Sequence, residues 1–560
     1  MLRTNRPEQW LILPVILLFA ACAHVPPKVA LESRGMVVAA HPIAAEFGYE
    51  ILQSGGNAID AAVATAMVLG VVEPHASGLG GGGGMLIYLA DQDSLTYINY
   101  YPRAAHEIPK EFRYCRDGYT AKAVLVPGTV AGLSMALQKY GTMSWQEILE
   151  RSIEKVKNGF VIDEHFNKVI LDSYEILSGH EQTADIFLNE MLPFELGDTL
   201  VNTDILRTFR YLADNGPEFF YEGDLADSIE TIMIREGGQI RKSDLQSYQA
   251  IELSPVSTDY RAYHIVSSPP PQSGLTTLEI LNILELQDIR AMGDFKYHDS
   301  TFHFMAEAMK LGYADRDQYL GDPQFVDVPV DILIDDAYAK SRYAEMDHGK
   351  AIWGEGENTP AGSIRESLSD ESDDPDGSTT HLSVIDRAGN AVSLTQTLSR
   401  YWGSGISVGG FLLNDGMTSF SISTKANIIE PDKQPRSTIS PSFIFKNDEL
   451  YVIVGTPGGG RIPATMVEII TNLLDFDQNA VEANRAPRFY SRDNSRTIAV
   501  ERRFDQSLLD ALEKRGHKIE VFGEMDNYFG GVHLIMIDQK TGELFGSADP
   551  RRSGVVAGGQ

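Results

Sequence analysis

The order of apolar and polar residues along the chain predicts helices first. Between residues 43 and 52, apolar side chains recur at the spacing of one helix face, and two glycines follow as a stop. Residues 58–72 are mostly Ala and Val, which is typical of a helix that packs closely on every side. Five consecutive glycines at 80–84 precede an apolar stretch and predict a tight turn into a strand.

The middle of the chain, from about residue 120 to 343, has a mainly helical pattern that the proline-rich segment 269–274 interrupts. The clearest amphipathic helices are expected at 144–157, 225–236 and 301–319. From about 347 to 378 the chain turns polar and acidic, which is typical of a flexible loop.

After residue 378 the period of apolar residues changes to two, which predicts strands. Hairpins are expected at 380–398, 442–454 and 533–547, with helices at 463–474 and 506–514. Strands with helices on either side predict a layered α+β sandwich.

Composition narrows the possible functions. The 560 residues carry a formal net charge of −31, which argues against nucleic acid or a membrane surface as partners, because both attract clustered Lys and Arg. Only two cysteines are present, which excludes a disulfide framework and a multi-cysteine metal site. The thirteen histidines lack HExxH-like spacing, so we expect no metal ion and no other cofactor.

Residues 1–21 have the pattern of a secretory signal peptide. Two arginines precede an apolar run at 11–21, which is too short to span a bilayer because a span takes about 20 residues. The run ends FAAC, and Cys22 resembles the lipidated cysteine of a bacterial lipoprotein. We expect export to the cell envelope, periplasmic or at the cell surface, with a lipid anchor at Cys22. The alternative is ordinary signal-peptidase cleavage near Ala23.

The segment most informative about chemistry is DGSTTHLSV, residues 376–384. The acidic loop runs here directly into a strand that begins with Thr379 and Thr380. Taken alone, a threonine at the tip of a strand is an ordinary β-branched strand residue.

Other segments give Thr379 a different meaning. In chain order they are GGNAIDAAVATAMVLGVVEPHASGLGGGG (55–83), VPGTVAGL (126–133), YADRDQYLGDP (313–323), GNAVSLTQTL (389–398) and TPGGGRI (456–462). Together with TTHLSVID they resemble the γ-glutamyltransferase family of N-terminal-nucleophile hydrolases. The resemblance covers nearly all of the chain after about residue 29.

The resemblance implies a four-layer αββα sandwich and a precursor that cuts itself between Ser378 and Thr379. A signal peptide (1–21), a large fragment (22–378) and a small catalytic fragment (379–560) would result, with the two fragments remaining together as a heterodimer. Cleavage would give Thr379 a free α-amine, whose reference pKa of about 7.7–8.0 suits a general base.

The resemblance also assigns roles to other residues. Thr397 matches the second threonine that orients the nucleophile, and Gly458 and Gly459 match the backbone N–H pair that stabilises the oxyanion. Ser437 and Thr438 match a hydroxyl pair that holds the substrate carboxylate, and Arg436 adds a positive charge beside them.

The sequence departs from the family where the glutamyl group is held. The usual Arg-Glu pair is replaced by Tyr101-Pro102, with Arg103 two positions late. Ser399 stands in place of an asparagine, and Ser419 in place of the aspartate that takes the substrate ammonium.

The resulting hypothesis is a self-processing γ-glutamyl amide hydrolase or transferase acting on glutathione-like small molecules or peptides through an acyl-enzyme on Thr379. One alternative is an amidohydrolase of the same fold with shifted acyl specificity, either a glutaryl-type acylase or an enzyme that cleaves γ-linked polymers. The other is a non-enzymatic surface binding protein.

Overall fold

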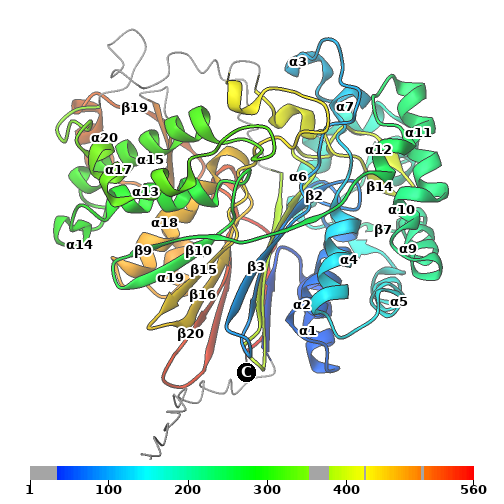
Figure 1. Cartoon of the computed structure of the whole chain (residues 1–560), viewed down its shortest axis with the longest axis horizontal. Helices are drawn as coiled ribbons and strands as arrows, with labels where there is room; N and C mark the ends of the chain where they lie inside the picture. The colour runs from blue at the N-terminus through cyan, green and yellow to red at the C-terminus, as the bar shows by residue number, and fades with distance from the viewer. Residues whose placement is uncertain (1–34, 352–377, 422–423, 493–496, 560) are drawn as a thin grey trace, which may run out of the picture.

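Two antiparallel sheets packed face to face form the centre of the computed structural model, which describes residues 35–351, 378–421, 424–492 and 497–559 (Figure 1). The first sheet has seven strands in the order β22-β1-β11-β12-β2-β3-β8. Their bounds are β1 Gly35–Ala39, β2 Gly82–Leu89, β3 Ser94–Asn99, β8 Ile251–Leu253, β11 Thr380–Asp386, β12 Ala391–Thr397 and β22 Val555–Gly558. The strand that begins after Thr379, β11, therefore lies inside the sheet with β1 on one side and β12 on the other.

The second sheet has six strands in the order β21-β20-β16-β15-β10-β9. Their bounds are β9 Val256–Tyr260, β10 Tyr263–Ser267, β15 Ser442–Lys446, β16 Glu449–Gly455, β20 His533–Ile537 and β21 Leu544–Ala548. A small third sheet contains β17 Phe489–Ser491, β18 Thr497–Glu501 and β19 Lys518–Phe522.

Alternating side chains of the strands build three apolar layers. In β1, Met36 and Val38 pack against Phe443 and Ile453 of the second sheet, while Val37 faces the helices on the other side. The outer face of the first sheet is covered by α1 Pro42–Gln53, α2 Ala58–Val72 and α4 Thr129–Tyr140, and that of the second by α13 Gly274–Leu284, α15 Asp299–Tyr319 and α18 Ile462–Leu474. The expected αββα sandwich is confirmed.

The helices predicted from the sequence have bounds close to the expected ones. Helix α2 has the predicted bounds because Asn57 accepts from the backbone N–H groups of Ile59 and Asp60 and closes a capping box. The expected amphipathic helices correspond to α5 Trp145–Val156, α11 Asp224–Glu236, α15, α18 and α20 Gln506–Lys514. Other long helices are α9 Thr203–Asn215 and α17 Asp336–Tyr343.

The structure adds detail to two expectations about secondary structure. The glycine run is not only a turn, because β2 already begins at Gly82. A Cβ on Gly84 would lie 1.7 Å from the Tyr97 hydroxyl oxygen, so glycine lets β2 fit closely against its neighbour. The stretch from 120 to 343 is mainly helical, as expected, and β9 and β10 within it add two strands to the second sheet.

The predicted signal peptide, Cys22 and most of the predicted acidic loop lie outside the described residues. Within the described part of the chain, no helix is both long enough and apolar enough to cross a bilayer.

Candidate active site

Thr379 lies at the entrance to β11, deep in the sandwich, and only 3% of its surface is exposed. Its hydroxyl donates to the carbonyl oxygen of Ser378, the residue to which it is still joined. The same hydroxyl lies 3.2 Å from the hydroxyl of Thr397, the last residue of β12. The antiparallel register, which sets Thr380 opposite Gln396, brings the two threonines together from positions 18 residues apart.

The Thr397 hydroxyl is fixed by further contacts. It lies 3.1 Å from the Ser378 carbonyl oxygen and accepts from the Ser399 backbone N–H at 2.9 Å. Ser399 has a φ of +85°, a conformation that a serine seldom adopts. This left-handed turn directs the Ser399 amide back to Thr397, and it leads the chain into the wall of a pocket.

The glycine turn after β16 lies beside the two threonines. Gly458 and Gly459 have φ values of +144° and +54°, and a Cβ on Gly458 would lie 3.1 Å from the Gly530 Cα. The Tyr313 hydroxyl donates to the Gly460 carbonyl oxygen at 2.6 Å and holds the turn from the side of α15. Gly459 and Gly460 line the pocket, and Gly458 adjoins them.

A pocket opens to solvent in front of Thr379. Its volume, counted together with the solvent at its opening, is about 720 Å³. Most of the site residues predicted from the sequence line it. They are Thr379, Thr397, Ser399, Ser419, Arg436, Ser437, Thr438 and Gly459. The structure thus brings together residues that the sequence separates by up to 80 positions.

Arginines are the charged residues that line the pocket within the described chain. Four arginines line it, namely Arg316, Arg400, Arg436 and Arg492. Asp415 pairs with Arg400 at 2.5 Å, and Asp317 pairs with Arg436 at 2.6 Å from behind the wall. No carboxylate is among the residues that line the pocket within the described chain, so the site suits an anionic ligand in spite of the chain's net charge of −31.

Tyr101 occupies the corner where the hydroxyl residues gather. Ser399 Oγ and Ser419 Oγ lie 3.5 Å apart there. Burial raises the pKa of Tyr101, while hydrogen bonds with Ser437, Ser419 and Ser399 act in the opposite direction. The neutral phenol and the serines form a polar wall without charge.

Arg103 lies elsewhere. Its guanidinium donates to Ser247 Oγ at 2.8 Å and lies over the Tyr248 ring, and it is not among the residues lining the pocket. The substrate-binding role expected of Arg103 therefore has no support in this geometry.

Several pocket residues were not predicted from the sequence. Arg316 and Tyr313 lie within the motif YADRDQYLGDP, and Arg400 directly follows Ser399, so their positions beside other site residues were the available clue. Tyr490 and Arg492 come from the end of β17, and nothing in the local sequence distinguishes them.

Among the described residues, His303, Glu307 and His517 lie close enough together to hold a metal ion. His303 Nδ1 lies 2.8 Å from His517 Nε2, and the Lys310 ammonium pairs with Glu307 at 2.7 Å. Because Lys310 already supplies the positive charge beside Glu307, a second cation there would be repelled. The group lies on α15 and before β19, and it does not line the pocket of Thr379.

Comparison with known proteins identifies the family of this chain. The sequence profile of γ-glutamyltranspeptidases matches residues 44–559. The chain belongs to the γ-glutamyltranspeptidase family. A glutathione hydrolase proenzyme of Escherichia coli (strain K12) is 38% identical over 92% of this chain and 90% of its own length. An Acylase ACY 1 proenzyme of Pseudomonas sp. (strain V22) is 35% identical over 95% of both chains.

Structural similarity points to the same family. A cephalosporin acylase from Bacillus halodurans superposes with a TM-score of 0.83 at 29% identity and covers 99% of both chains. The resemblance stated from the sequence is confirmed, as are the N-terminal-nucleophile hydrolase fold and the expectation of an enzyme.

Proposed function

We propose that this member of the γ-glutamyltranspeptidase family matures by cutting itself before Thr379 and then uses Thr379 as the nucleophile of an amide hydrolase or transferase. The observation that carries the proposal is the position of the Thr379 hydroxyl. It contacts the Ser378 carbonyl oxygen and lies 3.2 Å from the Thr397 hydroxyl, and both threonines line the arginine-lined pocket.

Maturation would begin with attack of Thr379 Oγ1 on the Ser378 carbonyl carbon. The C–N bond then breaks, the nitrogen takes the hydroxyl proton, and Ser378 is left as an ester on Thr379. Water hydrolyses that ester, which frees the Ser378 carboxylate and regenerates the hydroxyl. The products would be residues 22–378 and 379–560, held together as a heterodimer.

In the mature enzyme, the Thr379 amine would accept the hydroxyl proton as Oγ1 attacks the acyl carbon of the substrate. Backbone N–H groups at Gly458 and Gly459 would stabilise the oxyanion, and the Thr397 hydroxyl would hold the amine in place. The leaving amine takes the proton back, and water or an acceptor amine then cleaves the ester on Thr379.

From membership of the family, we expect the transferred acyl group to be γ-glutamyl, as in glutathione and related peptides. Arg436, Ser437 and Thr438 would hold its carboxylate. No cofactor takes part in this chemistry.

A second candidate, a glutaryl-type acylase, has one observation in its favour. Asp415 forms an ion pair with Arg400. Ser419 and Tyr101 present only hydroxyl groups where the α-ammonium would bind. A glutaryl group carries the same distal carboxylate and lacks the ammonium, so it would leave no charge unpaired in this corner.

The location of the enzyme follows from its first residues. We expect export by the signal at 1–21 and anchoring through a lipidated Cys22. Fractionation of cells that express Cys22→Ser should find the enzyme released from the membrane, because serine lacks the sulfur to which the lipid would be attached. Unchanged membrane retention would contradict the anchor.

Thr379→Ala tests the central proposal. The native protein should run as two fragments on a denaturing gel and should hydrolyse γ-glutamyl or glutaryl anilides. The variant should remain one chain without activity, because a single hydroxyl serves both steps. Two fragments from the variant, cut after Ser378, would contradict the assignment.

A further inference from the structure

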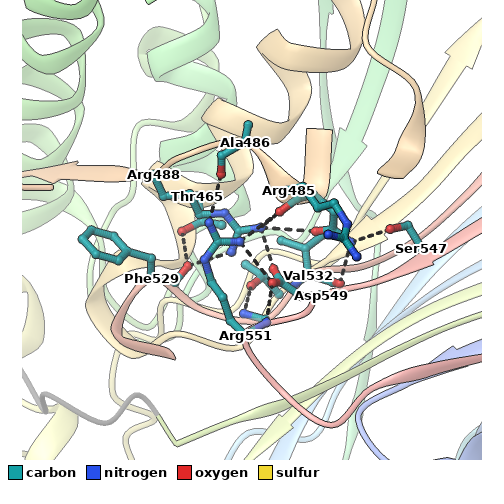
Figure 2. A network of polar contacts seen from close by, with 12 residues as sticks. Thr465, Arg485, Ala486, Arg488, Phe529, Val532, Ser547, Asp549 and Arg551 are labelled. Atoms are coloured by element: carbon teal, nitrogen blue, oxygen red, sulfur yellow. Dashed lines mark hydrogen bonds and ion pairs between the residues drawn. The ribbon is translucent and has the colours of Figure 1, made fainter. Parts of the chain in front are cut away.

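The C-terminal segment of the chain passes directly behind the nucleophile. Figure 2 shows the network that fixes its first part. Asp549 accepts from Arg488 at 2.6 Å and from Arg551 at 3.1 Å, and Arg551 also pairs with Glu501 at 2.7 Å. Because these side chains are almost completely buried, the backbone at the next residue, Arg552, has a defined position.

Arg552 reaches Thr379 from that position. Its Nη1 donates to the Thr379 carbonyl oxygen at 2.9 Å, and the same nitrogen lies 3.6 Å from Glu73 Oε1. The Arg552 side chain is 0% exposed and that of Glu73 is 5% exposed. Glu73 is the C-cap residue of α2, so the contact joins the N-terminal helices to the nucleophile through the C-terminal segment.

Several titratable groups of the described residues surround Arg552. Burial lowers the pKa of His41 and His165 to about 4 and that of His533 to about 3, and it lowers the pKa of His75 as well. These histidines are therefore neutral at the pH of the reaction. The acidic neighbours are Glu73, Asp163 at the start of α6 Glu164–Asp172, and Asp549, which Arg488 and Arg551 already pair.

We propose that Arg552 is a positioning residue that holds the nucleophilic threonine in place by its carbonyl oxygen, with Glu73 orienting the guanidinium. The inference rests on the proposed function of Thr379. Once the bond to Ser378 is cut, Thr379 loses its covalent tether on one side and lies just outside the hydrogen-bonded ladder of β11. The carbonyl contact then restrains the residue that must present both a hydroxyl and an amine.

The same arrangement makes an electrostatic prediction. The amine formed on Thr379 would lie on the same residue as the carbonyl that Arg552 holds. A positive charge there lowers the pKa of the amine, and a negative charge at Glu73 raises it. Burial raises the pKa of Glu73 itself to about 7, against the opposite effect of Arg552, so this carboxyl ionises in the range in which the amine works.

Two variants test the positioning role. Arg552→Gln should slow self-cleavage and lower kcat at least about tenfold with KM within about twofold, because the acyl pocket is untouched while the nucleophile is misplaced. Arg552→Lys should recover part of the loss, since an ammonium can reach the carbonyl but not both partners. The matched control is Arg261→Gln, because Arg261 also donates to main-chain carbonyls, those of Glu285 and Gln287, away from the pocket.

The pH profile of kcat gives a result that a purely structural role would not produce. Arg552→Gln should move the acid limb to higher pH, and Glu73→Gln should move it to lower pH, each by about 0.5 unit or more. Glu73→Gln preserves the shape of the side chain, so it decides the question if Arg552→Gln does not fold.

The inference would be overturned if Arg552→Gln had the native kcat. It would also be overturned if the acid limbs of the two variants stayed in place or shifted in the same direction. Failure of the proposed function looks different, because the native and Thr379→Ala proteins would then behave alike. If only this inference fails, the native enzyme matures and works, and Arg552→Gln does so equally.

Discussion

Arginines gather in two regions of this molecule, and the regions differ in how their charge is balanced. In the buried network behind Thr379, Asp549 pairs with both Arg488 and Arg551, and every partner is almost completely buried (Figure 2). In the pocket in front of Thr379, four arginines are part of the lining, and two aspartates behind the wall pair with Arg400 and Arg436. The arginines of the network pair with carboxylates among themselves, whereas those of the pocket line a volume to which the described residues contribute no carboxylate.

The largest effect should come from breaking the balanced region. Asp549→Asn takes the paired carboxylate from Arg488 and leaves Arg551 with Glu501 alone, so it should lower the free energy of unfolding by about 3–5 kcal/mol. Urea unfolding of the uncut Thr379→Ala chain measures this change without a contribution from fragment association. The control is Asp259→Asn, whose exposed pair with His264 is worth at most about 1 kcal/mol.

Acid should also lower the stability of the native chain, because it protonates the Asp549 carboxylate. Burial alone would raise the pKa of Asp549, but Arg488 and Arg551 lower it to about 2. A carboxyl with a depressed pKa stabilises the fold above its unfolded value of about 3.9, and this contribution is lost as the pH falls toward 2. Asp549→Asn should lack that part of the pH dependence, and an unchanged acid transition would contradict the role of Asp549.

Substitutions of the pocket arginines should weaken substrate binding. Arg436→Gln removes a charge-assisted contact worth about 1.5–3 kcal/mol, so KM for a carboxylate-bearing donor should rise about tenfold to a hundredfold. Because the substitution also leaves Asp317 without its closest cation, the double variant with Asp317→Asn serves as control. A KM that returns to the native value in the double variant would show that Arg436 acts through the fold.

The smallest predicted effect concerns the uncharged corner. With hydroxyls at Tyr101 and Ser419, the native enzyme should prefer γ-glutamyl over glutaryl anilide by no more than about tenfold in kcat/KM, or about 1.4 kcal/mol. Ser419→Asp should raise that ratio, while the neutral Ser419→Asn should not. A native preference of several hundredfold would mean that another group binds the ammonium.

The sequence predicted the parts of the molecule that depend on local pattern and on ordered motifs. Helix α2 and the β11–β12 hairpin follow from their periodicity, and the pocket contains most residues that the motifs indicated. The sequence did not predict side-chain direction, so Arg103 was placed in a pocket that it does not reach. It also did not predict long-range neighbours such as Arg492 and Arg552, because only the folded sheets bring them to Thr379.

If the chain is cut after Ser378 as proposed, the order of strands has a consequence for how the cut enzyme refolds. Residues from both sides of position 378 alternate within each sheet, as where β1 lies between β22 and β11, and where Val266 of β10 pairs with Phe443 of β15. A cut there breaks one peptide bond and leaves every inter-strand hydrogen bond in place. Refolding, however, changes its reaction order: the uncut chain regains its sheets at a rate independent of concentration, whereas the cut enzyme must first bring two chains together. Maturation would thus make denaturation hard to reverse in dilute solution.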